Sequence, residues 1–313
     1  MSWLQRLGLW VDTRGGPRRQ RRFREGWSAR TSDEIRFYST PNVQYRYRER
    51  ASAQPDAPTI VLTADPPVTL EAYDELLDVF EQQFRIVVVE LPAMGFSATR
   101  TGFSFGFRET NDDLARFLEG VVGTPAILAF SCVAGLAAID LASRHPELAS
   151  HVVVMQTGDV AAFDRWKAAR DPHGILGKPV AGQIMMKRLA RKRMPDWYRL
   201  AVGRPESVPP LCACAAESFE HGALWSLASA YQVYVNPNNE LGRVTQPLLA
   251  VWGRADGSHP DAHERSALSF AEHATLIAFD DLGHFSELED PARIFATIRD
   301  FVDAEAASAA APT

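Results

Sequence analysis

Short apolar runs alternate with amphipathic segments through most of the chain after residue 34. Runs of this length and spacing predict buried strands, and the segments 70–84 and 109–121 have helical periodicity. The predicted buried strands are 59–62, 85–90, 127–130, 151–155, 247–252 and 274–279. Alternation at 35–38 and 43–50 predicts a meander pair ahead of them. Strands separated by helices predict an α/β fold with a mostly parallel central sheet and helices on both faces.

The rhythm stops between 157 and 243, where we expect no strand. This stretch contains many aromatic residues, among them Trp166, Trp197 and Trp225, together with Met185 and Met186. We interpret it as a helical cap over the mouth of the site, with these side chains lining a mostly apolar pocket. A purely structural helical subdomain is the alternative.

The two ends of the chain differ from its centre. Residues 1–34 are expected to form a basic N-terminal extension, in which Trp3, Leu4, Leu7 and Trp10 have helical spacing. The extension could bind an anionic partner or membrane surface, but we favour an arm whose tryptophans pack on its own domain or on a second subunit in a homodimer. The predicted core comprises 35–156 and 244–305, with a last helix over 291–302 and a disordered tail at 306–313.

Composition narrows the class of protein. The chain has 313 residues and a formal net charge of −6, which gives no general case for nucleic-acid binding. Three cysteines do not make a disulfide framework, and Cys212-Ala213-Cys214 is a weak metal signal. We see neither an apolar run of signal-peptide length nor a membrane span. We therefore expect a cytoplasmic protein in which a free thiol persists.

The segment 127–141 carries the strongest chemical signal. An apolar strand leads through Ser131 and Cys132 into small residues at Ala134 and Gly135, and an apolar-periodic helix follows. Such a strand–turn–helix raises one side chain above a sheet edge and directs helix N–H groups at it. Cys132 and Ser131 are the candidates for that side chain, and a buried structural cysteine without chemistry is the third interpretation.

This segment resembles the nucleophile elbow of the α/β-hydrolase superfamily, usually G-x-S-x-G. With Cys132 as the nucleophile, small Ala134 stands two residues later, although bulky Phe130 replaces a small residue on the other side. With Ser131, β-branched Val133 occupies the far side. In the family the elbow helix typically ends in a His-Pro-Glu turn about thirteen residues after the nucleophile, and His145 stands thirteen after Cys132. We favour Cys132 and keep Ser131 as the alternative.

Two later loops extend the resemblance. The segment 252–256 resembles the family's catalytic-acid loop and offers Asp256, with Asp281 as the rival acid. The segment 280–285 resembles its Gly-His loop and offers His284. The order nucleophile, Asp, His is the order of this fold. The resemblance implies a triad in which His284 takes the thiol proton and Asp256 orients the imidazole.

The oxyanion hole departs from the family pattern. Thr63-Ala64-Asp65 stands where relatives have His-Gly, so the backbone N–H groups of Asp65 and Val133 would be the donors, and the charge of Asp65 is unusual there. His259 and His263 are four residues apart, but no third ligand is evident and a surface helix is the better interpretation. We therefore expect no metal and no cofactor.

The expected function is acyl transfer to water or to another acceptor. The substrate would be an ester, thioester or lactone of a mostly apolar small molecule, which a carrier could present. Hydrolase, thioesterase and acyltransferase activities all fit. The alternatives are a non-catalytic ligand-binding homologue, a C–C bond hydrolase and a Ser131-based esterase. Epoxide and halide hydrolysis are not expected, because those relatives carry Asp at the elbow.

Overall fold

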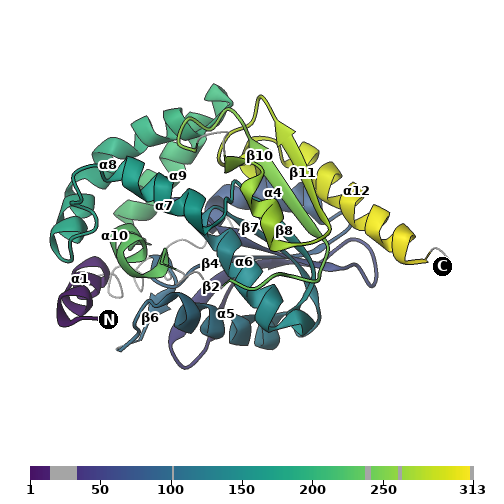
Figure 1. Ribbon diagram of the computed structural model, residues 1–313, viewed down its shortest axis with the longest axis horizontal. Coiled ribbons are helices and arrows are strands. Elements are labelled where there is room, and N and C mark those ends of the chain that lie inside the picture. Colours follow the sequence, from purple (N-terminus) through teal and green to yellow (C-terminus); the bar gives the residue numbers. More distant parts are fainter. Residues whose placement is uncertain (15–33, 101, 237–240, 260–262, 311–313) are drawn as a thin grey trace.

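The central element of the computed structural model is a nine-stranded sheet in the order β1-β2-β4-β3-β7-β8-β10-β11, with β6 paired to β2 (Figure 1). The structure describes residues 1–14, 34–100, 102–236, 241–259 and 263–310. The strands are β1 Ile35–Ser39, β2 Val43–Arg50, β3 Thr59–Ala64, β4 Arg85–Glu90, β6 Ala98–Thr99, β7 Ala126–Ser131, β8 Ala149–Met155, β10 Leu248–Gly253 and β11 Ala274–Phe279.

The neighbouring strands β4, β3, β7, β8, β10 and β11 run parallel, whereas β1, β2 and β6 form antiparallel pairs at one side. The carboxyl ends of β3, β7, β10 and β11 therefore meet at one edge of the sheet, where α/β proteins bind their ligands. The expected fold class is confirmed at this level.

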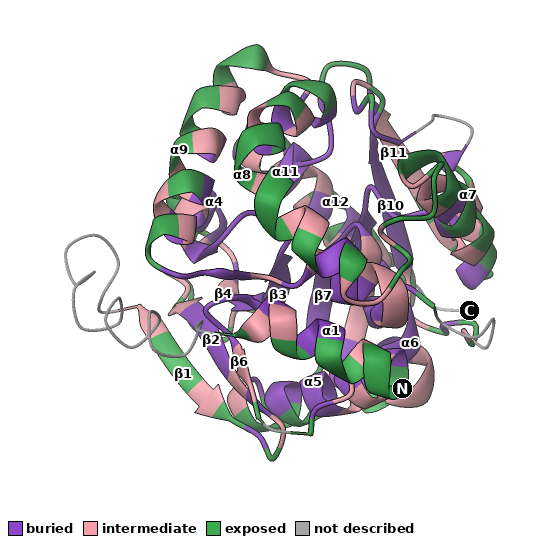
Figure 2. Cartoon of the chain, turned by 90° about the vertical axis from the view of Figure 1, so that its left-hand side faces the viewer, coloured by how far each residue is buried: buried purple, intermediate pink, exposed green. Residues whose placement is uncertain are grey.

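Helices cover both faces of the sheet. α5 Phe107–Val121 and α6 Val133–Arg144 lie on one face, and α4 Asp74–Phe80 and α12 Pro291–Ala310 pack together on the other. Two separate hydrophobic clusters result, because successive strand residues point to opposite faces. In β7, Leu128 and Phe130 belong to the first cluster, and Ile127 and Ala129 to the second. Figure 2 shows the burial concentrated in the central strands.

The predicted cap region lies between β8 and β10. Its main helices are α7 Val160–Arg170, α8 Ala181–Ala201 and α9 Val208–Glu220, with shorter elements at α10 Leu227–Ser229 and η4 Ala230–Tyr234. The expectation that this region contains no strand is wrong. β9 Leu224–Trp225 pairs antiparallel with β5 Met94–Gly95, which satisfies backbone groups and joins the region to the loop after β4.

Several expected boundaries also change. The predicted helix 70–84 is a 3₁₀ turn, η1 Leu70–Tyr73, followed by α4. Another 3₁₀ turn, η6 Ser266–Phe270, lies between β10 and β11. The other short turns are η2 Pro146–Leu148 and η3 Pro205–Ser207. α12 continues to Ala310, through most of the segment in which we expected a disordered tail. Its alanines favour helix without needing burial.

The N-terminal helix α1 Trp3–Thr13 packs on α8 and α10 (Figure 1). Gly8, Leu9 and Asp12 are buried in this contact. Trp3 and Trp10 do not pack on their own domain, because they are 71% and 52% exposed, and packing on a second subunit stays a prediction. Most of the arginine-rich arm, at 15–33, lies outside the described residues. Among the described helices, none has the length and apolarity needed to cross a membrane.

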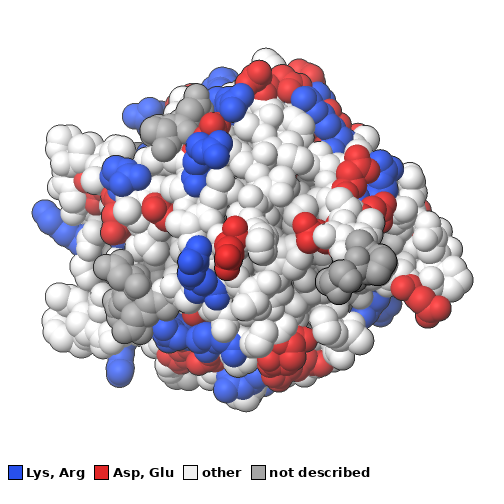
Figure 3. All heavy atoms as spheres, turned by 45° about the vertical axis from the view of Figure 1, so that its right-hand side comes forward, with Lys and Arg blue, Asp and Glu red and all other residues white. Residues whose placement is uncertain are grey.

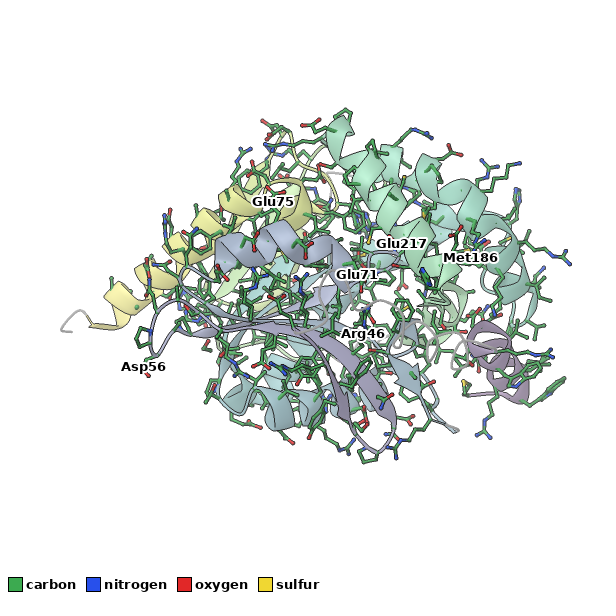
Figure 4. All side chains as sticks on the ribbon, turned by 180° about the vertical axis from the view of Figure 1, so that it is seen from behind. Arg46, Asp56, Glu71, Glu75, Met186 and Glu217 are labelled. Carbon is green, nitrogen blue, oxygen red and sulfur yellow. The ribbon has the colours of Figure 1, made fainter. Side chains whose placement is uncertain are left out.

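A buried ion cluster supports the loop after β4. Arg46 on β2 pairs with Glu90 at 2.9 Å and with Glu71, and Figure 4 shows Arg46 and Glu71 close together. The N–H of Phe96 donates to Glu90 at 2.6 Å. Gly95 has φ +51°, and a side chain there would collide with the Glu90 carboxylate. Because each buried charge has a partner, the cluster fixes the loop that carries β5.

On the molecular surface shown in Figure 3, basic and acidic residues are interspersed.

Candidate active site

Cys132 stands alone between β7 and α6, at the elbow that the sequence predicted. Its φ of 54° and ψ of −130° lie in a region that non-glycine residues rarely adopt, at a cost of about 1–3 kcal/mol. The N–H of Cys132 donates to the Met155 carbonyl at 2.8 Å, and Thr157 Oγ1 donates to the carbonyl of Cys132 at 2.8 Å. At Gly135, a Cβ would lie 2.1 Å from Thr157 Oγ1. The turn therefore requires a small residue there.

Ser131 points to a different part of the structure. It is the last residue of β7, and its Oγ donates to Glu287 Oε1 at 3.0 Å. Burial raises the pKa of Glu287 to about 7, against the opposing effect of this hydrogen bond. The structure does not bring the alternative nucleophile into a hydrogen bond with His284.

His284 is held by backbone contacts to the end of α8. Its N–H donates to the Ala201 carbonyl at 2.8 Å, and a Cβ at the preceding Gly283 would lie 2.2 Å from that same oxygen. Glu289 accepts hydrogen bonds from the N–H groups of Gly203 and Gly283, at 2.8 and 3.1 Å. The Gly-His loop seen in the sequence and the carboxylate of Glu289 thus position the imidazole.

Asp256 occupies the position expected for the acid. Its Oδ2 lies 2.8 Å from Nδ1 of His284, and its Oδ1 accepts the N–H of Ser258 at 2.7 Å. Burial opposes its ionisation, but the charge of His284 and hydrogen bonds from His259 and His284 hold the pKa of Asp256 below its usual range. The rival Asp281 is half-exposed and pairs with Arg293 at 2.7 Å and Arg204 at 3.2 Å. It makes no described hydrogen bond with His284.

The main surprise is the carboxylate of Asp65, which follows β3. Its Oδ2 lies 2.8 Å from Nε2 of His284, the nitrogen that a triad would use for the nucleophile. Ligand atoms of Asp65, Cys132 and His284 all lie within 4.8 Å of one another. Burial opposes a charged imidazole, yet the charge of Asp256 and the hydrogen bonds that the ring donates to both aspartates raise the pKa of His284 well above normal. At rest His284 is therefore a cation between two carboxylates.

The same neighbours act on the thiol. Burial and the charge of Asp65 raise the pKa of Cys132, and this outweighs the opposing effects of His284 and of the Val133 N–H. The resting group is therefore a thiol. Val133 N–H, at the start of α6, approaches the sulfur as the predicted elbow requires. The oxyanion donors at Asp65 and Val133 stay a prediction.

His259 corrects another expectation. It does not lie on a surface helix, because it is 5% exposed and its Nδ1 lies 3.0 Å from Asp256 Oδ2. Its ring stacks on Trp166 of α7 at 5.5 Å and 10°. Its position three residues after Asp256 is the signal in the sequence for this contact. The sets Asp65–Cys132–His284 and Asp256–His259–His284 are groups whose ligand atoms come close enough for a metal, but hydrogen bonds already join the carboxylates and imidazoles within them.

The cap region reaches the site through Trp197 of α8. Its ring makes an edge contact with His284, at a centroid separation of 5.6 Å. Other cap residues expected to line a pocket lie elsewhere. Trp166 borders a cavity beside Asp256, and Met186 and Trp225 border a cavity next to α1. Cys132 is 7% and His284 1% exposed, so a substrate needs local opening to reach the sulfur.

Known proteins resemble this chain at low sequence identity. No family model matches the sequence. A biotin biosynthesis bifunctional protein from Teredinibacter turnerae is 22% identical over 300 residues, covering 88% of this chain and 50% of that protein. A pimeloyl-[acyl-carrier protein] methyl ester esterase from Vibrio vulnificus is 24% identical over 223 residues, covering 66% of this chain and 79% of that protein. This chain thus spans half the length of the first relative.

Among solved structures, the Cif epoxide hydrolase from Acinetobacter nosocomialis superposes with a TM-score of 0.72. The two chains are 16% identical, with 91% of this chain and 95% of that one covered. At this identity the likeness concerns the fold. Together, fold and relatives support the α/β-hydrolase superfamily expected from the sequence, and they are consistent with the expected hydrolase-type enzyme.

Proposed function

We propose that this protein is a cofactor-free acyl-transfer enzyme in which Cys132 is the nucleophile, His284 the acid–base group and Asp256 the orienting acid. The observation that carries the proposal is the placement of Cys132 at a strained turn, with its sulfur beside an imidazole whose far nitrogen is held by Asp256. A nucleophile, a base and an orienting acid in this order are the parts that acyl transfer requires.

The protonation states of the resting site give Asp65 a role in the first step. At rest the thiol carries a proton, His284 is an imidazolium and Asp65 is its partner. His284 passes its Nε2 proton to Asp65 and receives the thiol proton, so that thiolate, imidazolium and a neutral Asp65 carboxyl face the substrate. The thiolate attacks the carbonyl carbon, and the N–H of Val133 and the Asp65 carboxyl can donate to the developing oxyanion.

In the remaining steps a thioester forms on Cys132 and is hydrolysed. The tetrahedral intermediate collapses, and the leaving group departs with the proton of His284, which leaves a thioester on Cys132 and a neutral imidazole. Water gives a proton to His284 as its oxygen attacks the thioester. The acid is released, and the thiolate recovers its proton from Asp65. An acceptor other than water gives acyl transfer in place of hydrolysis.

The relatives suggest a substrate class. The Vibrio vulnificus relative is named for a methyl ester whose acyl group is joined to a carrier protein. We extend to this chain an ester, thioester or lactone of a mostly apolar acyl group, free or carrier-bound. The location remains the cytoplasmic one expected from the sequence, and a homodimer through the N-terminal extension remains a prediction.

One observation favours the alternative of a ligand-binding homologue without turnover. Asp65 occupies Nε2 of His284, and in the absence of proton transfer this hydrogen bond leaves Cys132 without a base. The two functions differ in whether a covalent intermediate forms.

The test is intact-protein and peptide mass spectrometry after mixing with p-nitrophenyl acetate. We expect one acetyl group on the peptide that contains Cys132, formed together with a burst of p-nitrophenolate. Cys132→Ala should lose both signals, and Cys212→Ala, a thiol of the cap region, should keep them. Acetylation of Ser131 would favour the serine-based esterase. Absence of any acyl-enzyme and of turnover would favour the binding homologue.

A further inference from the structure

A cavity lies beside Asp256, and its lining includes neither Cys132 nor His284. It has a volume of about 600 Å³ and lies between α7 and the loop after β10. Its lining includes Arg165, Trp166, Arg170, Arg254, His259 and His263, together with Asp256. Apart from Asp256, the proposed mechanism uses none of these side chains.

The charge around this cavity is predominantly positive. Arg165 Nε donates to His263 Nε2 at 3.1 Å, and Arg170 donates to the Ser258 carbonyl at 2.6 Å. Both contacts are to neutral acceptors, and no ion pair of either arginine is found among the described residues. Arg254 is neutralised by Glu264 at 2.9 Å and Asp280 at 2.8 Å. Two α7 guanidinium groups are therefore available for an anion.

His259 adds a specific polar atom to the lining. The residue is 5% exposed, and its Nε2 is buried with no hydrogen-bond partner in the described structure. Its Nδ1 is hydrogen-bonded to the Asp256 carboxylate and so carries the proton. Nε2 of the neutral ring is then an acceptor that lacks a donor. Burial lowers the pKa of His259, which favours this neutral form, and stacking on Trp166 fixes the ring.

We infer that this cavity binds a phosphoryl group that retains a P–OH. Its charged oxygens would accept from Arg165 and Arg170, and its hydroxyl would donate to Nε2 of His259. Neither a carboxylate nor a sulfate has that hydroxyl at neutral pH, so the unpartnered acceptor selects phosphate chemistry. Inorganic phosphate keeps such a hydroxyl at neutral pH, whereas a phosphate monoester, whose second pKa is about 6, is mostly a dianion without one.

Binding here also reaches the catalytic acid. Asp256 Oδ2 is shared between Nδ1 of His259 and Nδ1 of His284. When the phosphate hydroxyl donates to Nε2 of His259, the ring gains positive character and its Nδ1–H donates more strongly to Asp256 Oδ2. The hydrogen bond from His284 to the same oxygen is then weakened. This part rests on the proposed function, and it predicts that bound phosphate lowers kcat more than it changes KM.

The test is isothermal titration calorimetry of the full chain at pH 7.5 with inorganic phosphate, phenyl phosphate and sulfate in separate titrations. We expect one phosphate per chain, bound at least about tenfold more tightly than sulfate. Phenyl phosphate, which at this pH is mostly a dianion without a P–OH, should bind no better than sulfate, and an affinity equal to that of inorganic phosphate would contradict the role of the hydroxyl. Quenching of Trp166 fluorescence gives a second readout.

Arg165→Ala and Arg170→Ala should each weaken phosphate binding about tenfold or more, and His259→Phe, which retains a ring to stack on Trp166, should remove the preference over sulfate. Arg193→Ala is the matched control, because Arg193 is an exposed arginine of α8. Equal affinity for the two anions, or binding unchanged in the Arg165 and Arg170 variants, would overturn the inference. Both outcomes are independent of esterase activity, so failure of the proposed function is distinguishable.

Discussion

Oδ2 of Asp65 and Nε2 of His284 lie 2.8 Å apart, so an acid from the end of β3 occupies the nitrogen that would serve the nucleophile. The other nitrogen of the same ring is 2.8 Å from Asp256. His284 therefore bridges two carboxylates beside a protonated thiol. Reaction at Cys132 therefore requires a change in the hydrogen bond between Asp65 and His284.

The nucleophile can be distinguished by paired alanine variants. Cys132→Ala should abolish hydrolysis of p-nitrophenyl acetate above the rate of a buffer blank, because the sulfur beside His284 is lost. Ser131→Ala should retain most of the rate, since Ser131 Oγ faces Glu287. Initial rates and circular dichroism spectra of both variants make the comparison. Full activity in the first variant would remove Cys132 from the mechanism.

The charge of Asp65 should suppress alkylation of Cys132. Asp65→Asn removes a negative charge that raises the pKa of the thiol, so the iodoacetamide rate at pH 7 should increase by about tenfold, corresponding to one pKa unit. Peptide mass spectrometry separates Cys132 from Cys212 and Cys214. Asp280→Asn, on the surface beside Arg254, is the control and should leave the rate unchanged. A slower reaction in Asp65→Asn would contradict the stated electrostatics.

The catalytic acid can be tested by a ranking of two asparagine variants. Asp256→Asn should lower the acylation rate by about 10²–10⁴, because the imidazole loses its orienting carboxylate. Asp281→Asn should lower it far less, since Asp281 pairs with Arg293 and Arg204 at the surface. Stopped-flow measurement of the p-nitrophenolate burst gives both rates. The reverse order would transfer the role of the acid to Asp281.

Asp12 should make the packing of α1 depend on pH. Burial raises its pKa to about 6, although hydrogen bonds from Ser229 and the charge of Lys187 oppose the shift. The unfolded carboxyl ionises at lower pH, so stability falls as pH rises toward and through about 6. The wild-type protein should lose about 1–2 kcal/mol between pH 5 and pH 8 from this group.

Asp12→Asn keeps an acceptor for Ser229 Oγ, which donates to Asp12 at 2.7 Å, but cannot ionise. Its thermal midpoint should exceed that of the wild type at pH 8 by several degrees, with a smaller difference at pH 5. Differential scanning calorimetry at the two pH values gives the comparison, and Asp196→Asn, on the exposed side of α8, serves as control. An equal difference at both pH values would show that Asp12 does not titrate in this way.

The strand pattern and the position of the elbow could be predicted from the sequence because they depend on local periodicity. The predicted strand 85–90 agrees with β4, and the predicted strand 274–279 agrees with β11. The last helix was predicted too short, because burial ends near Val302 while its alanine-rich continuation remains helical. Short motifs also identified Asp256 and His284, which the fold brings to 2.8 Å.

The sequence left open which of two adjacent residues faces the imidazole. Ser131 ends a strand and follows its alternation toward Glu287, whereas Cys132 leaves the strand with a positive φ. Only the tertiary structure reveals the contacts of Asp65 with His284 and of His259 with Asp256. Asp65 and His284 are 219 positions apart, and no local pattern encodes a hydrogen bond between them. Periodicity therefore determined the elements, and the parallel sheet, by bringing the ends of β3, β7, β10 and β11 to one edge, decided which charges surround the thiol.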